Sequence, residues 1–330
     1  MLYEDSFLQR LESLLRAALV EWGLAADSAM KLLTISENAT WLVTHPRSGE
    51  RVVMRVHRPD YSSEAEIRSE LAWLEALRTA GTVNTAAPIR RRDGEYIGCL
   101  WDRGSARYVV AFTFVAGHEP DAGADLRHWY SELGRITAAL HQHSRHWRKP
   151  AGFVRKHWDY DSMIGAGALW GDWRAAPGLT DAGRNIIAQT AEVVRQQLRD
   201  YGQDEARFGL VHCDLRLANL LVDGRRLTVI DFDDCGSCWY MYDFAAAVSF
   251  LEQDPRVADF KAAWLQGYRT QTPLSAADES ALTMFMMLRR IQLTAWITSH
   301  VETPTAQNLQ PAAYTQGTVA LAAHYLRETA

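Results

Sequence analysis

The spacing of apolar residues divides the 330-residue chain into a strand-rich first part and a helical second part. Apolar residues recur on one helical face from Phe7 to Leu19, which predicts a helix at the start. Alternating and β-branched stretches then predict an antiparallel sheet of five strands, with a helix over 63–77 inserted after the third strand. The predicted strands are 31–35, 39–44, 51–57, 95–101 and 107–115.

The apolar pattern changes to a helical period after Gly117. Helices are predicted over 126–140, 180–200, 255–269, 276–300 and 311–327, with two short strands within 219–232. We therefore predict an α+β chain of two domains. The first, over 1–116, is an antiparallel β-sheet lobe, and the second, over 117–330, is a mainly helical lobe.

Composition and charge restrict the class of protein. The 35 basic and 40 acidic residues give a formal net charge of -5, which would repel a phosphate polymer, so we expect no nucleic-acid partner. Four cysteines are too few for a disulfide scaffold in a chain of this length. No basic segment of a signal peptide opens the chain, and no apolar run approaches the roughly 18 residues of a membrane span. We expect a cytoplasmic protein without a membrane partner, and the sequence does not indicate its oligomeric state.

The segment from His212 to Asp234 carries the candidate chemistry. Asp214 and Asn219 share a predicted loop, and Asp231 follows an apolar strand. Phosphoryl transfer requires metal ions that neutralise the triphosphate and a carboxylate that orients the attacking hydroxyl. Asp214 is the predicted catalytic carboxylate. Asn219 and Asp231 offer hard oxygen ligands for Mg²⁺, and the hairpin between them would bring these ligands together.

This segment, H-x-D-x-x-x-x-N followed by an apolar strand that ends in I-D-F, resembles the aminoglycoside phosphotransferase family. That family includes homoserine kinase, choline kinase and the bacterial stress response kinase A. The resemblance covers about residues 30–300 and implies a bilobal, protein-kinase-like fold. It also implies ATP and Mg²⁺ as cofactors, with Asp214 as the base that activates a hydroxyl of a small molecule, such as an amino alcohol or an aminoglycoside.

The resemblance further implies phosphate-binding residues in the first lobe. The turn that contains Ser36 and Asn38 takes the place of the glycine-rich loop over the phosphates. Arg55 stands where the family has a lysine that holds the α- and β-phosphates and pairs with a helix glutamate. Arginine keeps the positive charge of lysine, but its guanidinium group is planar, whereas the ammonium group of lysine acts as a point charge. Glu70 is the predicted partner, and Glu66 is the alternative.

The family resemblance also implies an adenine site and two residues that support the catalytic loop. Val53 and the strand end 112–115 would enclose the adenine, and the backbone of Thr113 and Val115 would supply its hydrogen bonds. A packing role for these apolar residues is equally consistent. Asp243 resembles the family's buried aspartate that braces the catalytic loop, and His212 resembles the residue that packs behind that loop.

Other polar residues leave alternatives open. Asp233 and Asp234 extend the acidic cluster, where they could contact a metal or a cationic acceptor, or cap the next helix. Cys235 and Cys238 match C-x-x-C but lack a second pair for zinc, and a turn explains their position better than a redox motif. His141 belongs to an H-x-H-x-x-H group near a predicted helix end, where interaction with the helix dipole is expected.

Three functions are compatible with this sequence. The first is a small-molecule kinase. The second is a protein Ser/Thr kinase, because the S-E-N turn and the helix over 288–297 are similar to those of stress response kinase A. The third is a non-catalytic ATP-binding regulatory protein, suggested by Arg55 in place of a lysine.

Overall fold

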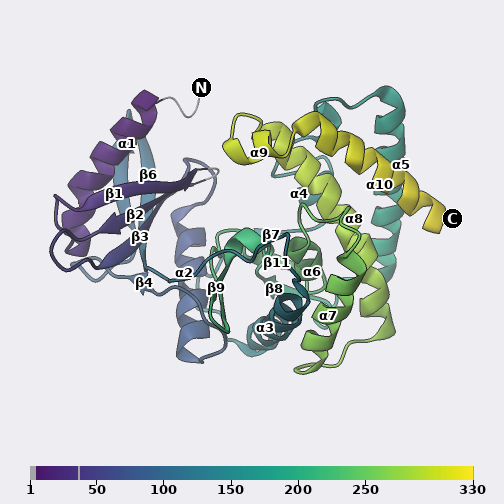
Figure 1. The fold of residues 1–330 in the computed structure, drawn as a ribbon, viewed down its shortest axis with the longest axis horizontal. Coiled ribbons are helices and arrows are strands. Elements are labelled where there is room, and N and C mark those ends of the chain that lie inside the picture. Colours follow the sequence, from purple (N-terminus) through teal and green to yellow (C-terminus); the bar gives the residue numbers. More distant parts are fainter. Residues whose placement is uncertain (1–4, 36–37, 330) are drawn as a thin grey trace. The chain divides into compact units, whose positions relative to one another are not determined.

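The computed structural model describes residues 5–35 and 38–329, which form two compact units (Figure 1). Unit 1 comprises the chain up to Ala116 together with Lys149–Val154. Unit 2 comprises Gly117–Arg148 and the chain from Arg155 onward. Unit 1 is built on an antiparallel sheet and unit 2 is mainly helical, which confirms the predicted α+β class.

The sheet of unit 1 has the strand order β1-β2-β3-β6, with β4 and β5 both paired to β6. All of these pairings are antiparallel. The two-residue β4 was not predicted, because such a short strand carries no periodicity. The last strand, β6, ends at Thr113, so Val115 lies beyond it. The strands are β1 (Ala29–Ile35), β2 (Ala39–Thr44), β3 (Arg51–Val56), β4 (Pro88–Ile89), β5 (Gly98–Asp102) and β6 (Ser105–Thr113).

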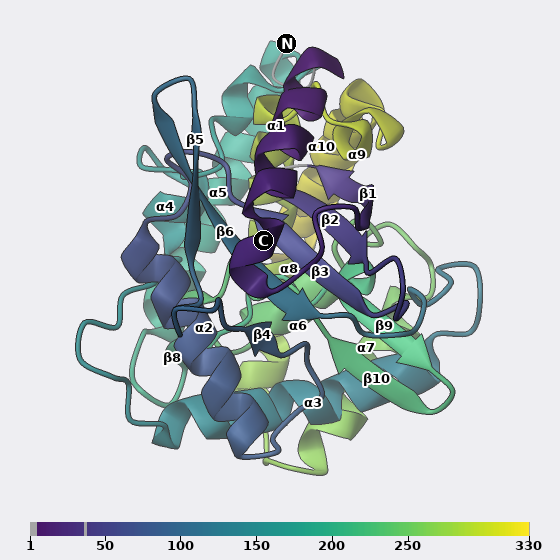
Figure 2. The same cartoon turned by 90° about the vertical axis from the view of Figure 1, so that its left-hand side faces the viewer.

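Helices cover the two faces of this sheet. Alternate residues of β3 (Val52, Met54 and Val56) join Leu11 and Leu15 in a buried core. The last two belong to α1 (Asp5–Ala18), which crosses the sheet in Figure 2 and continues into η1 (Leu19–Trp22). The opposite face of β3 contacts α2 (Glu64–Thr79). The period-2 alternation of β3 therefore sends apolar side chains to one face and Arg55 to the other.

Unit 2 consists mainly of helices, among which α5, α8 and α10 pack together (Figure 1). Two small sheets lie among the helices, the β9-β10 hairpin and the sheet β7-β11-β8. No helix within residues 5–35 and 38–329 has the length and apolar character needed to cross a membrane. The helices are α3 (Arg127–His146), α4 (Tyr160–Ile164), η2 (Trp173–Ala175), α5 (Asp181–Tyr201), η3 (Leu217–Asn219), α6 (Tyr242–Ala247), α7 (Val257–Arg269), α8 (Ala276–Ser299), α9 (Pro304–Asn308) and α10 (Pro311–Thr329). The strands are β7 (Lys156–His157), β8 (Phe208–Val211), β9 (Leu220–Asp223), β10 (Arg226–Val229) and β11 (Gly236–Trp239).

Two glycines allow α3 and α7 to pack backbone against backbone. A Cβ atom on Gly134 of α3 would lie 2.0 Å from the carbonyl oxygen of Trp264 on α7. A Cβ atom on Gly267 of α7 would lie 1.7 Å from the carbonyl oxygen of Ser131 on α3. Neither backbone oxygen can move aside as a flexible side chain would, so both positions require glycine at this helix crossing.

Replacing Gly267 with alanine is expected to lower the free energy of unfolding by about 3 kcal/mol or more, because the added methyl group forces α3 and α7 apart. Urea unfolding measures this loss. The control is Gly123→Ala, where the new Cβ would lie 3.3 Å from the Asp121 carboxylate in an exposed loop, and where we expect a change within about 0.5 kcal/mol. Equal effects of the two substitutions would contradict the close packing.

Candidate active site

The loop that carries Asp214 begins where β8 ends and is fixed by a buried carboxylate. Cys213 has a φ of 68°, a left-handed backbone conformation that is uncommon for a residue other than glycine. The carboxylate of Asp243 accepts a hydrogen bond from the backbone N–H of Cys213 at 2.8 Å and from that of His212 at 3.3 Å. The bracing role predicted for Asp243 thus has a geometric basis, since its carboxylate holds the strained residue next to Asp214.

A second layer of polar groups supports Asp243. The Nε2 atom of His141 lies 3.0 Å from Asp243 Oδ2, and its Nδ1 atom lies 2.9 Å from the Tyr268 hydroxyl. Burial lowers the pKa of His141, although the nearby Asp243 opposes this effect, so the imidazole is neutral at neutral pH. The neutral ring donates from Nε2 to Asp243 and accepts from Tyr268. The expected helix-dipole role is therefore wrong for His141, which is a fully buried support of the loop.

His212 is also buried and neutral. Burial lowers its pKa, its Nδ1 accepts from the backbone N–H of Asp214 at 3.2 Å, and its Nε2 lies 3.2 Å from the carbonyl oxygen of Ile230. Both ring nitrogens are therefore engaged with backbone groups. This arrangement is that of a packing residue behind the loop, and it leaves no ring nitrogen for proton transfer.

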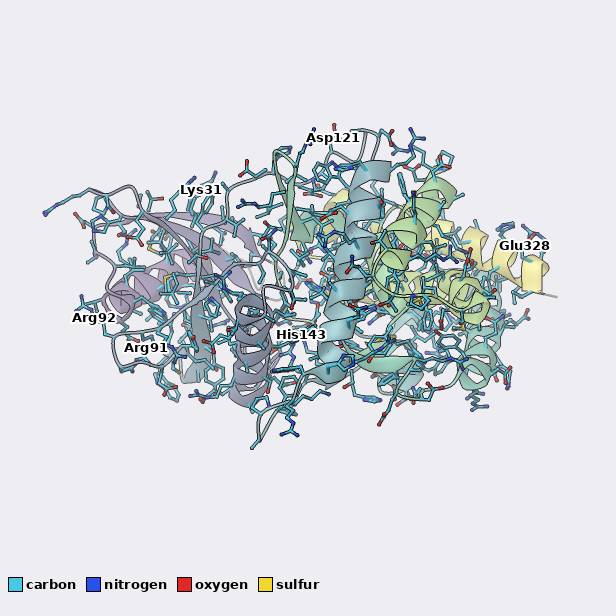
Figure 3. All side chains as sticks on the ribbon, turned by 90° about the horizontal axis from the view of Figure 1, so that it is seen from below. Lys31, Arg91, Arg92, Asp121, His143 and Glu328 are labelled. Atoms are coloured by element: carbon cyan, nitrogen blue, oxygen red, sulfur yellow. The ribbon has the colours of Figure 1, made fainter. Side chains whose placement is uncertain are left out.

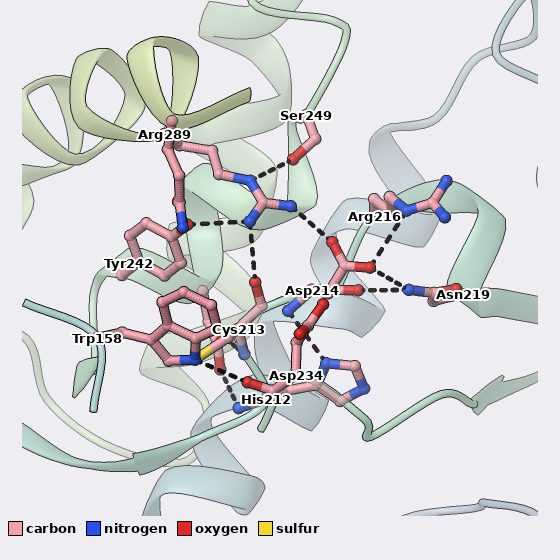
Figure 4. A network of polar contacts seen from close by, with 12 residues as sticks. Trp158, His212, Cys213, Asp214, Arg216, Asn219, Asp234, Tyr242, Ser249 and Arg289 are labelled. Atoms are coloured by element: carbon pink, nitrogen blue, oxygen red, sulfur yellow. Dashed lines mark hydrogen bonds and ion pairs between the residues drawn. The ribbon is translucent and has the colours of Figure 1, made fainter. Parts of the chain in front are cut away.

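The carboxylate of Asp214 is held from two sides (Figure 4). Its Oδ1 accepts a hydrogen bond from Nη2 of Arg289 at 2.6 Å. Its Oδ2 accepts from Nδ2 of Asn219 at 2.6 Å and from Nε of Arg216 at 3.2 Å. Burial opposes the ionisation of this carboxyl, but the two arginines outweigh burial and hold the pKa of Asp214 below its ordinary value. The group is therefore an ionised carboxylate at neutral pH.

Asn219 and Asp231 lie at the open end of the β9-β10 hairpin. The hairpin pairs Leu220 with Val229, and the N–H of Ile230 donates to the carbonyl of Asn219 at 3.0 Å. Both side-chain hydrogen bonds of Asn219 use Nδ2, which leaves Oδ1 as the atom that could face a metal. Asp231 is exposed and has a left-handed φ of 60°. Strain of this kind often marks a functional position.

One amide oxygen and one carboxylate suit Mg²⁺, which keeps several water ligands and is usually held by one or two carboxylates together with substrate phosphates. They would not form a closed all-protein site. Among the residues that the structure describes, no group of three or more His, Cys, Asp or Glu side chains is arranged to hold a metal.

In unit 1 the structure pairs Arg55 with Glu70. Nη2 of Arg55 lies 2.7 Å and 2.6 Å from the two carboxylate oxygens of Glu70, and both side chains are buried. Glu66, the alternative partner, instead closes the capping box at Ser63. Lys31 is exposed on β1 (Figure 3), so it does not replace the lysine that is missing from β3.

Breaking this ion pair is expected to cost stability. Glu70→Gln should lower the free energy of unfolding by about 3 kcal/mol, because removing one partner of a buried pair leaves the other charge poorly compensated. The matched control is Glu12→Gln, which removes an exposed pair with Arg16 on α1 and should cost less than about 0.5 kcal/mol. Chemical unfolding of both variants measures the difference, and equal losses would argue against a buried pair at Arg55.

The other residues predicted to bind nucleotide have varied surroundings. Val53 is half-buried and lies opposite Phe112 in the β3-β6 register. The N–H of Thr113 donates a hydrogen bond to the carbonyl of Ala87 at 2.8 Å, so this N–H is not available to the adenine. The carbonyl of Thr113 takes no part in that hydrogen bond. Asn38 accepts from the backbone N–H of Arg58 at 3.3 Å. Ser36 lies outside the described residues.

The residues after Asp231 form a strand, not a helix. Cys235 precedes β11 and Cys238 lies within it, opposite β8, so the pair does not open a helix as a thioredoxin-like motif would. Burial raises the pKa of Cys238, which disfavours the reactive thiolate. Asp233 and Asp234 cap no helix, because β11 follows them, and Asp234 forms an ion pair with Lys156 at 3.1 Å.

Comparison with known proteins supports the same class of chemistry. The sequence pattern of the phosphotransferase enzyme family matches residues 32–278. A solved microcompartment-associated aminopropanol kinase is 41% identical, with a TM-score of 0.89 over 96% of this chain and 98% of that one. The amicoumacin kinase of Bacillus subtilis (strain 168) is 21% identical over 295 residues, which cover 85% of this chain and 82% of the kinase.

A further solved structure shows the fold. The amicoumacin kinase hAmiN, in complex with AMP-PNP, Ca²⁺ and Ami, has a TM-score of 0.76 at 18% identity and covers 96% of this chain and 94% of its own. These matches agree with the predicted protein-kinase-like fold. The chain belongs to the phosphotransferase enzyme family, and it is a kinase that transfers a phosphoryl group to a hydroxyl.

Proposed function

We propose that the protein transfers the γ-phosphoryl group of ATP, in the presence of Mg²⁺, to the hydroxyl of a small amino alcohol. The observation that carries this proposal is the ionised Asp214, fixed on a braced loop beside Asn219. The acceptor class is supported by 41% identity to an aminopropanol kinase over 96% of the chain. Relatives of lower identity support the reaction class but not the acceptor.

Asp214 would orient the acceptor hydroxyl and accept its proton. Oδ2 already accepts two hydrogen bonds and Oδ1 only one, so Oδ1 retains the greater capacity to accept the hydroxyl proton. As that proton moves to Asp214, the acceptor oxygen forms a bond to the γ-phosphorus and the bond from this phosphorus to the leaving oxygen of ADP breaks. The proton on Asp214 then passes to solvent, which can reach its partly exposed side chain.

We propose Oδ1 of Asn219 and the carboxylate of Asp231 as the metal ligands. A bound Mg²⁺ neutralises charge on the triphosphate. The left-handed backbone at Asp231 and the hydrogen bond between Ile230 and Asn219 fix the two ligands at adjacent ends of one hairpin. The chain therefore contributes two oxygen donors of the type that Mg²⁺ prefers.

Unit 1 is proposed to bind the nucleotide. Arg55, oriented by Glu70, would bind the α- and β-phosphates, since a guanidinium can contact phosphate through two hydrogen bonds. The missing lysine suggested a non-catalytic protein, but Arg55 retains the cationic charge and a glutamate partner. The remaining proposed nucleotide-binding residues of unit 1 are Ser36, Asn38, Val53, Val115 and the carbonyl of Thr113.

A screen of acceptors tests the proposal. ADP release is measured with ATP and Mg²⁺ against aminopropanol, ethanolamine, choline, aminoglycosides, sugars and a generic protein substrate. We expect an amino alcohol to give a kcat/KM at least about tenfold above the other classes. Turnover with the protein substrate alone would instead favour the protein kinase alternative. ADP release that no acceptor stimulates, or nucleotide binding without turnover, would contradict the proposed transfer.

A further inference from the structure

A buried arginine of α8 contacts the Asp214 carboxylate from outside the loop that carries Asp214. Arg289 is 1% exposed and lies in the middle of a helix whose residues are buried almost continuously from Ala281 to Ile297. Arginine is rarely buried to this extent without a partner, because removing its charge from water is costly. The hydrogen-bond partners of Arg289 therefore indicate which groups it stabilises.

Every nitrogen of the Arg289 guanidinium has a partner (Figure 4). Nη2 donates to Asp214 Oδ1 at 2.6 Å, and Nε donates to the Ser249 hydroxyl at 3.0 Å. Nη1 donates to the Tyr242 hydroxyl at 2.9 Å and reaches the carbonyl oxygen of Cys213 at 3.4 Å. The contacts on Nε and Nη1 fix the plane of the guanidinium, and the remaining nitrogen meets the candidate catalytic carboxylate.

Aromatic rings complete the enclosure. The guanidinium carbon of Arg289 lies 5.0 Å from the centre of the Trp170 ring and 5.7 Å from that of Tyr242. Cation–π contacts of this kind favour the charged form of a desolvated cation. Burial by itself lowers the pKa of Arg289, but Tyr242 and Asp214 reverse this effect and raise it, so the guanidinium stays charged.

The next residue of the helix provides a contrast. Arg290 is also buried, at 3% exposure, but its partners are Glu252, Thr318 and the carbonyl of Tyr314. These contacts join α8 to α10 and to the segment between α6 and α7, and they do not include the Asp214 loop. The two adjacent buried arginines of α8 thus have different roles. Arg290 contributes to helix packing, and Arg289 contacts the Asp214 loop.

We propose that Arg289 is a positioning residue that sets the orientation of the Asp214 carboxylate for phosphoryl transfer. It binds the loop at the Cys213 carbonyl and at Asp214 Oδ1, while Asn219 and Arg216 hold Oδ2. With both oxygens held, the carboxylate plane is fixed before the acceptor binds. This inference rests on the proposed role of Asp214 as the base.

The matched substitutions Arg289→Lys and Arg290→Lys test this role. Lysine keeps the charge but cannot reproduce the guanidinium fork, so Arg289→Lys should lower kcat at least about tenfold with KM for ATP within about twofold. Arg289→Met should lower kcat by about a hundredfold or more. Arg290→Lys should reduce thermal stability but keep kcat, per nucleotide-binding molecule, within about twofold. Unchanged kcat in Arg289→Lys, or equal losses in the two lysine variants, would overturn the proposal.

A double variant separates this inference from the proposed function. If Arg289 acts through Asp214, then Arg289→Met in an Asp214→Asn background should reduce the residual turnover by less than about twofold, because residues that act as a unit are not additive. If Arg289→Met lowered turnover in the Asp214→Asn background by the same factor as in the wild-type protein, Arg289 would act independently of Asp214. Wild-type turnover in Asp214→Asn alone would instead refute the base assignment itself. If Arg289→Met does not fold, Arg289→Lys decides the question.

Discussion

Asp214→Asn is expected to reduce kcat by about a thousandfold or more while the affinity for ATP changes by no more than a few-fold. The amide has nearly the same size as the carboxylate, but only its oxygen can accept a hydrogen bond, so it keeps its donors on one side only. It carries no negative charge and cannot accept the hydroxyl proton. The nucleotide is assigned to other residues, so its binding should persist. ADP release gives kcat, and titration calorimetry gives the affinity for ATP.

The control for this variant is Asp223→Asn, at the exposed end of β9. This substitution also removes one carboxylate from the hairpin region, so it reports any general effect of charge. We expect its kcat to remain within about twofold of wild type. If Asp214→Asn turned over like the wild-type protein, Asp214 could not be the base. If it lost ATP binding as well, its role would extend to the nucleotide.

Asp231→Asn is expected to abolish the dependence of nucleotide binding on Mg²⁺. The residue has a φ of 60°, a conformation that asparagine adopts with little cost, so the backbone of the hairpin should be preserved. The substitution replaces a charged hard ligand with a neutral amide, and we expect the Kd for ATP in the presence of Mg²⁺ to rise by about a hundredfold. Calorimetry with Mg²⁺ and with a chelator measures this dependence.

The wild-type protein with chelator provides the reference for this variant. Its affinity for ATP should match that of Asp231→Asn, because both lack the same metal contact. Asp223→Asn again serves as the variant with one exposed carboxylate removed. A Kd for ATP that still depends on Mg²⁺ as in the wild type would show that the metal is held elsewhere.

Local sequence patterns predicted most of the fold and part of the site. The alternation of β3 placed Arg55 opposite the core face, so its position could be read from periodicity. Its pairing with Glu70 came from the family resemblance, which left Glu66 as the alternative. The two-residue strands β4 and β7 are too short to have a periodicity. The strand β11 was missed because the motif around Cys235 and Cys238 suggested a turn.

Residues that meet only through the tertiary fold could not be predicted. His141 contacts Asp243 across 102 positions of sequence, and Arg289 contacts Asp214 across 75. No local pattern links such pairs. One signal was available, because an arginine within a nearly continuous apolar helix requires a buried partner. That signal predicts that Arg289 has a partner but does not identify Asp214.

The predicted hydrogen bonds to the adenine show a different limit. The family resemblance implied that the backbone of Thr113, near the end of the predicted strand, hydrogen-bonds the adenine. The structure pairs the N–H of Thr113 with Ala87, next to β4, a strand that the pattern did not reveal. The missed strand therefore limits which backbone atom of Thr113 is available to the adenine.

A crystal structure of the protein with AMP-PNP, Mg²⁺ and aminopropanol tests the central claim most directly. The account predicts Asn219 Oδ1 and the Asp231 carboxylate as metal ligands, with the acceptor hydroxyl within hydrogen-bonding distance of the Asp214 carboxylate. A metal bound by other residues, or a hydroxyl directed away from Asp214, would contradict it.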